Sequence, residues 1–163
     1  MVWTTNVLVV ANVTATSPEL IAELTARASS GPARFTLVVP AAPGAEGRQR
    51  ADQALAAALE MMGAAGLEVE GHIGDSDPIC AVSDEWDPRR YDEIVLATLP
   101  ADVSKWLHGG LPERVERLTG ARVTHVVARP AKPEVTVHRA PAREKLGVMA
   151  PLSVLSWGGR RHR

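Results

Sequence analysis

Two adjacent glycines, Gly109 and Gly110, are the residues of this 163-residue chain that most directly suggest ligand binding. Pro112 follows them, and proline is favoured in the first turn of a helix, so the pair is predicted to precede a helix N-terminus. Free backbone N–H groups and the positive end of the helix dipole can bind an anion there. The simpler alternative, which we favour, is that the glycines only join two helices.

A pair of carboxylates offers a second kind of chemistry. Asp75 and Asp77 bracket one serine, and two acids at this spacing can both reach a Mg²⁺ ion in a phosphoryl-transfer enzyme. They follow a predicted edge strand, however, and Asp77 directly precedes Pro78, which is the form of a helix N-cap. We therefore predict that Asp77 caps a helix, and we keep a phosphoryl-transfer enzyme that uses Asp75 and Asp77 as a less favoured alternative.

Cys80 and His125 are the other candidate reactive groups. Cys80 with His72 and Asp84 could form a nucleophile, base and orienting acid, but a small buried side chain on a helix is the favoured interpretation. His125 lies in a predicted strand and could act as a pH switch or a ligand, although a hydrogen-bonded strand histidine is favoured. The chain has no nucleophile-elbow, Walker A or dinucleotide-binding motif, so we do not expect an enzyme.

The elements that would position these residues alternate along the chain. Short β-rich apolar segments are separated by longer Ala- and Leu-rich stretches at helical spacing, which predicts one open, doubly wound α/β sheet. Strands are predicted at residues 6–11, 34–39, 67–73 and 91–97, and from Arg122 to Ala128. Helices are predicted at residues 18–28, 48–64, 78–84, 103–108, and from Pro112 onward with Val115 and Leu118 on the buried face.

Charge divides the chain into two parts. The net charge is −1, but residues 130–163 carry seven Lys and Arg against two Glu, so this region is +5 and residues 1–129 are −6. We predict an α/β domain over 1–129 and a basic, Pro-punctuated tail over 130–163. Aromatic and basic side chains do not alternate in the tail, so neither nucleic acid nor a membrane is expected as a partner.

Cysteine usage and the N-terminus suggest the compartment. One cysteine permits no intramolecular disulfide, which is typical of a reducing environment. The apolar run at residues 7–11 is too short for a signal-peptide core or a membrane span. A cytoplasmic protein is expected.

Residues 6–128 resemble the universal stress protein family. The turn Gly74-Asp75 follows the third predicted strand as in that family, and residues 111–115 read Leu-Pro-Glu-Arg-Val, close to its typical Val-Ser-Glu-Arg-Val. The resemblance implies five parallel strands in the order 3-2-1-4-5, with helices on both faces of the sheet. It also implies a ligand crevice between strands one and four.

The chain departs from the loop that ATP-binding members use, which has the form Gly-x2-Gly-x9-Gly-Ser/Thr. Ala97 and Pro100 replace the first two glycines, and the spacer before Gly109 has eight residues. Proline has no N–H to donate to a phosphate. Asn12 stands where those members have an aspartate facing the ribose, and Trp106 can fill the nucleotide's space.

The resemblance, together with the altered loop, predicts a non-enzymatic stress-response or signalling module with a degenerate nucleotide site and no cofactor. The alternative is an adenine-nucleotide binder that holds ATP with an altered loop. Any ligand would occupy the crevice between strands one and four. Its predicted lining residues are Asn12, Val39, Ala97, Thr98, Gly109 and Gly110.

Assembly is predicted from the last strand. The segment from Arg122 to Ala128 would leave an unpaired edge carrying Val123, Val126 and Val127, and such edges are normally covered. Universal stress proteins often pair this edge across a two-fold axis, so a homodimer is expected. The tail from residue 134, with its alternating segment 134–138 and the apolar stretch ending at Trp157, would pack across the other subunit.

Overall fold

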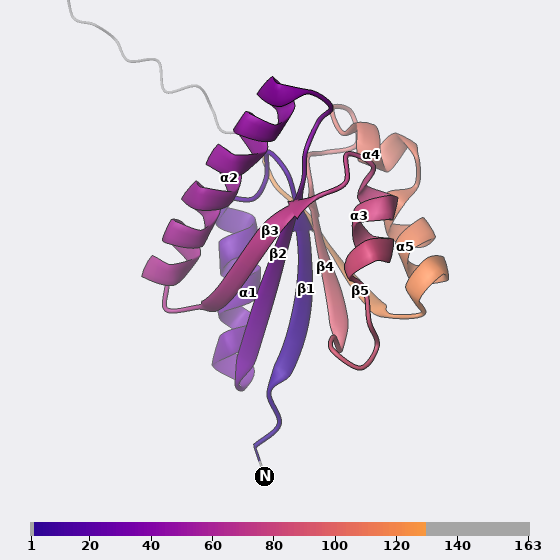
Figure 1. Cartoon of the computed structure of the whole chain (residues 1–163). Coiled ribbons are helices and arrows are strands. Elements are labelled where there is room, and N and C mark those ends of the chain that lie inside the picture. The colour runs from indigo at the N-terminus through magenta and orange to yellow at the C-terminus, as the bar shows by residue number, and fades with distance from the viewer. Residues whose placement is uncertain (1, 130–163) are drawn as a thin grey trace, which may run out of the picture. The chain divides into compact units, whose positions relative to one another are not determined.

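The computed structural model describes residues 2–129, which form a five-stranded parallel sheet in the order β3-β2-β1-β4-β5 (Figure 1). The predicted α/β class and strand order are therefore confirmed. The strands are β1 (Thr5–Ala11), β2 (Ala33–Pro40), β3 (Glu68–Gly74), β4 (Glu93–Thr98) and β5 (Arg122–Val127).

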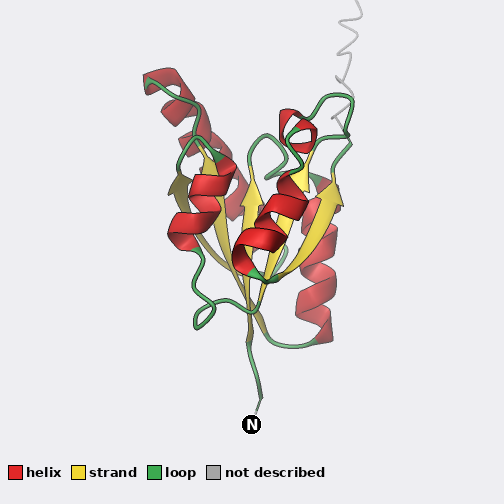
Figure 2. Ribbon diagram, turned by 90° about the vertical axis from the view of Figure 1, so that its right-hand side faces the viewer, coloured by secondary structure: helices red, strands yellow, loops and turns green. Residues whose placement is uncertain are grey.

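Helices cover both faces of the sheet. One face carries α1 and α2 and the other carries α3 and α5, while the short α4 lies near the carboxyl ends of the strands, away from the N-terminus (Figures 1 and 2). The helices are α1 (Pro18–Ser30), α2 (Ala45–Ala64), α3 (Pro78–Glu85), α4 (Lys105–His108) and α5 (Leu111–Thr119). No helix among residues 2–129 is long and apolar enough to span a membrane.

The burial of each strand matches its position in the sheet. Residues 7–11 of β1 are fully buried because helices pack on both sides of this central strand. In β3 the residues alternate between exposed and partly buried, as the predicted edge strand requires. The side chains of β1 alternate between the two cores: Val7 and Val9 face α1 and α2, whereas Leu8 and Val10 face α3 and α5.

The helix starts follow the predicted capping chemistry. The hydroxyl of Ser17 accepts a hydrogen bond from the Leu20 N–H, and Pro18 begins α1. The carboxylate of Asp77 accepts one from the Ile79 N–H at the start of α3.

Three local predictions are wrong. Helix α2 begins at Ala45, before the predicted start at residue 48; Gly47 permits this first turn to approach Ala42, whose carbonyl oxygen would lie 2.0 Å from a Cβ at position 47. Leu118 is 50% exposed, since β5 is the last strand and no further element among residues 2–129 covers the last turn of α5. Cys80 is exposed, because the buried residues of α3 are its neighbours Ala81 and Val82.

The predicted tail lies outside the described residues. This applies to residues 130–163, including the segment 134–138 and Trp157. The predicted boundary after residue 129 stays a prediction.

Candidate functional site

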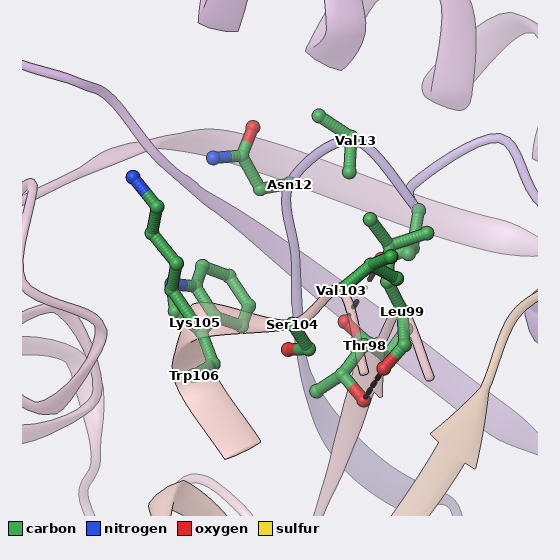
Figure 3. A pocket seen from close by; sticks show the side chains of 10 residues that line it. Asn12, Val13, Thr98, Leu99, Val103, Ser104, Lys105 and Trp106 are labelled. Atoms are coloured by element: carbon green, nitrogen blue, oxygen red, sulfur yellow. Dashed lines mark hydrogen bonds between the residues drawn. The ribbon is translucent and has the colours of Figure 1, made fainter. Parts of the chain in front are cut away.

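A pocket of about 200 Å³ opens where β1 and β4 end, at the point where the strand order reverses. Asn12, Val13 and Thr14 follow β1 directly and line one side of the pocket. The remaining lining residues come from the end of β4, the loop that follows it and the start of α4 (Figure 3); they are Ala97, Thr98, Leu99, Val103, Ser104, Lys105 and Trp106. Thus the crevice predicted from the topology is present.

Hydrogen bonds within the protein occupy the polar groups at the end of β4. The Thr14 hydroxyl donates to the Ala97 carbonyl oxygen at 2.8 Å, and the Thr98 hydroxyl donates to the Leu99 carbonyl oxygen at 3.0 Å. The Thr98 hydroxyl also lies 2.6 Å from Nε2 of His125 on β5. His125 is thus a hydrogen-bonded strand residue, and desolvation of its imidazole lowers the pKa of His125 below the ordinary value of 6.5, with Glu113 opposing that shift.

The loop between β4 and α5 folds onto its own backbone. The N–H groups of Val103 and Ser104 both donate to the Pro100 carbonyl oxygen, at 3.0 and 2.9 Å. Further along, the Leu107 N–H donates to the Ser104 hydroxyl, and the Gly110 N–H donates to the Leu107 carbonyl oxygen. These amides point into the loop, so they are not available to the phosphates of a ligand.

A second cavity of about 360 Å³ lies on the other side of Lys105 and Trp106, which line both. Gly109 and Arg114 line this second cavity, together with Asp77 at the start of α3. The half-buried Trp106 also packs against the core beneath α3 and α5. The indole therefore lies between two compartments at this end of the sheet, and Lys105 lines both of them.

The structure brings together only some of the residues predicted for the crevice. Asn12, Ala97 and Thr98 line the pocket. Val39 is fully buried in the core beneath α1 and α2. Gly109 lines the second cavity, and Gly110 is the N-cap of α5 with a left-handed φ of 62°.

Several residues that line the pocket were not among those predicted for it, namely Val13, Thr14, Leu99, Val103, Ser104 and Lys105. The available signal was a serine three residues before Leu107, which is a helix N-cap pattern. The helix predicted at residues 103–108 is α4, and α4 carries Lys105 to the crevice.

Residues of the two alternative catalytic groupings make contacts that fit structural roles. The Asp77 N–H donates to the Asp75 carboxylate at 2.8 Å, and Asp77 itself caps α3. His72 pairs with Glu85 at 3.2 Å rather than with Cys80. No group of three or more metal-ligating side chains occurs within residues 2–129.

The environment of Cys80 disfavours a thiolate. Desolvation raises the pKa of the Cys80 thiol above its ordinary value of 9.0, and the carboxylates of Asp77, Asp75 and Asp84 raise it further.

No protein-family model matches the chain, and no curated protein sequence does. Solved structures do resemble it. The universal stress protein from Archaeoglobus fulgidus in complex with dAMP has a TM-score of 0.57 and 17% sequence identity, over 77% of this chain and 99% of that one. A universal stress protein in complex with cAMP has the same score and identity, over 78% and 99%.

A further structure of a universal stress protein from Archaeoglobus fulgidus has a TM-score of 0.53 and 18% identity, over 77% of this chain and 95% of that one. The described residues therefore have the universal stress protein fold.

Proposed function

We infer that this protein is a non-enzymatic stress-response or signalling module whose nucleotide crevice no longer binds ATP. The observation that carries the proposal is the inward-folded loop after β4. Nucleotide phosphates at such a site are normally held by backbone N–H groups. Here the amides of Val103, Ser104 and Gly110 donate to carbonyl oxygens of the loop itself, and Pro100 has no N–H at all.

The size of the crevice supports the same proposal. Ligand pockets for drug-sized molecules usually enclose roughly 300–1,000 Å³. The pocket beside Asn12 encloses about 200 Å³, and Trp106 separates it from the next cavity. A nucleoside triphosphate would have to displace the indole, which is partly buried against the core.

An adenine-nucleotide binder is the second candidate, because two cations flank the divided crevice. Lys105 borders both cavities, and Arg114 borders the one that contains Gly109. Cationic side chains can neutralise phosphates where backbone amides are not available. Two structures with this fold are complexes with dAMP and cAMP, which makes adenine nucleotides the compounds to test.

Thermal unfolding with ATP, AMP and cAMP, with and without Mg²⁺, tests the proposal. A nucleotide present at one hundred times its Kd would stabilise the native state by about 2.7 kcal/mol, whereas we expect no shift at millimolar ATP. The Archaeoglobus fulgidus protein with dAMP serves as the positive control. Saturable ATP binding that is lost in both Lys105→Gln and Arg114→Gln would establish the second candidate instead.

We also propose a symmetric homodimer through β5. This strand is the last of the sheet, and its Val127 side chain is 45% exposed. Sedimentation velocity at micromolar concentration should give a dimer that Val127→Lys dissociates. The matched control is Met61→Lys, because Met61 is 44% exposed and belongs to α2, which packs on β3 and β2, whereas β5 is at the opposite edge of the sheet. A monomeric unmodified protein, or a dimer unaffected by Val127→Lys, would contradict this assembly.

A further inference from the structure

A larger cavity lies beside the crevice, between the start of α1 and the end of β5. It encloses about 580 Å³, which is within the range of small-molecule sites. Apolar side chains form much of its wall, namely Val13, Pro18, Leu99 and Ala128. Val13, Thr14 and Leu99 line both this cavity and the crevice, so these residues separate the two.

The Glu19 carboxylate is the charged acceptor in this wall. Its Oε1 accepts a hydrogen bond of 3.3 Å from the Arg129 N–H. Its Oε2 is buried and has no hydrogen-bond partner among residues 2–129. The first turn of α1 does not supply one, because Pro18 has no N–H and the Leu20 N–H donates to the Ser17 hydroxyl. A buried carboxylate oxygen without a donor is costly, so the site favours a molecule that brings one.

Within the described part of the chain, the charge of Glu19 also has no cationic side chain as a partner. None of the ion pairs within residues 2–129 includes it. Arg129 lines the same cavity, but its side chain is not within ion-pair distance of the carboxylate. The positive end of the α1 dipole stabilises the carboxylate without donating to Oε2.

We propose that this cavity binds a small organic cation, a primary ammonium group attached to an apolar body. The ammonium group donates a charge-assisted hydrogen bond to Oε2 of Glu19. The apolar body packs against Leu99, Val13 and Ala128, where it removes hydrocarbon surface from water. This ligand class has the opposite charge to a nucleotide, and its site lies on the other side of the wall formed by Val13 and Leu99.

Titration of the full-length, ¹⁵N-labelled protein with 2-phenylethylammonium tests the site by NMR. Amide signals of Ser17, Glu19 and Ala128 should shift in a saturable manner. Two probes of similar shape separate charge from apolar contact: 2-phenylethanol, which is neutral, and phenylacetate, which is anionic. We expect the alcohol to bind at least about tenfold more weakly than the ammonium ion, and the acid not to bind. Equal binding of the amine and the alcohol would overturn the proposal, as would preferential binding of the acid.

Substitution of the carboxylate provides the second test. Glu19→Gln keeps the shape and an acceptor for the Arg129 N–H, so the fold should persist while the Kd for 2-phenylethylammonium rises about tenfold to a hundredfold. Glu46→Gln is the matched control, because Glu46 also lies in the first turn of a helix and is exposed to solvent. An unchanged Kd in Glu19→Gln would refute the assignment. Both titrations are done without nucleotide, so ATP binding at the crevice, or its absence, does not affect either outcome.

Discussion

Replacing Gly71 by alanine should destabilise the fold at the contact between α2 and β3. A Cβ at this position would lie 2.7 Å from the Leu37 carbonyl oxygen and 2.8 Å from Cδ1 of Leu55. The carbonyl belongs to the neighbouring strand β2 and cannot move without disturbing the sheet, so α2 and β3 would have to shift. Overpacking of this kind typically costs about 1–3 kcal/mol. We expect about 2 kcal/mol for Gly71→Ala.

Gly63→Ala is the matched control, because it adds the same methyl group where nothing lies within 4 Å. Gly63 is inside α2, and alanine in a helix is more favourable than glycine by roughly 0.5–1 kcal/mol. Urea unfolding of the two full-length variants should therefore give opposite changes in the free energy of unfolding. If Gly71→Ala were as stable as the unmodified protein, the close approach of β3 to α2 and β2 would be wrong.

Three further predictions concern the site and its surroundings. A variant that restores the family's loop should gain ATP affinity measurable by calorimetry; it combines Ala97→Gly, Pro100→Gly, Gly110→Ser and one inserted spacer residue. No gain in affinity would show that features outside the loop also prevent ATP binding. Because the pKa of His125 in the folded protein is lowered below 6.5, the unfolded chain binds more protons, so this residue's stabilising contribution is present above pH 6.5 and lost as the pH falls. Urea titrations at pH 7.5 and 5.5 should show a smaller loss of stability for His125→Gln than for the unmodified protein, and equal losses would contradict the desolvation of the ring. Cys80, with its raised pKa, should react with iodoacetamide at pH 8 more slowly than a cysteine in an unstructured peptide, and an equal or faster rate would refute this expectation.

The sheet could be predicted from the sequence because burial leaves a direct pattern. The unbroken apolar run at residues 7–11 indicates a strand covered on both faces, and the alternation at residues 67–73 indicates an edge. The capping residues Ser17 and Asp77 were predictable for a similar reason, since their neighbours are adjacent in the chain.

The site was harder to predict. Its lining depends on the face toward which each strand side chain points and on how the loop after β4 folds back on itself. Val39 lies near the carboxyl end of β2, but strand side chains alternate between faces, and this one points into the core. The positions of Ser104 and Lys105 depend on the loop turning back onto the Pro100 carbonyl oxygen. That turn is a three-dimensional arrangement without a distinctive periodicity.

The wall shared by the two cavities has a thermodynamic consequence. Val13 and Leu99 line both the crevice and the cavity beside Glu19, so a ligand that pushes these side chains toward one space narrows the other. Val13 is 71% exposed and has room to move. Occupancy of the two spaces would then be negatively coupled, and by linkage each ligand would weaken the other's binding by the same factor. An organic cation beside Glu19 would therefore bind more weakly whenever any molecule occupies the crevice beside Asn12 and pushes Val13 toward Glu19.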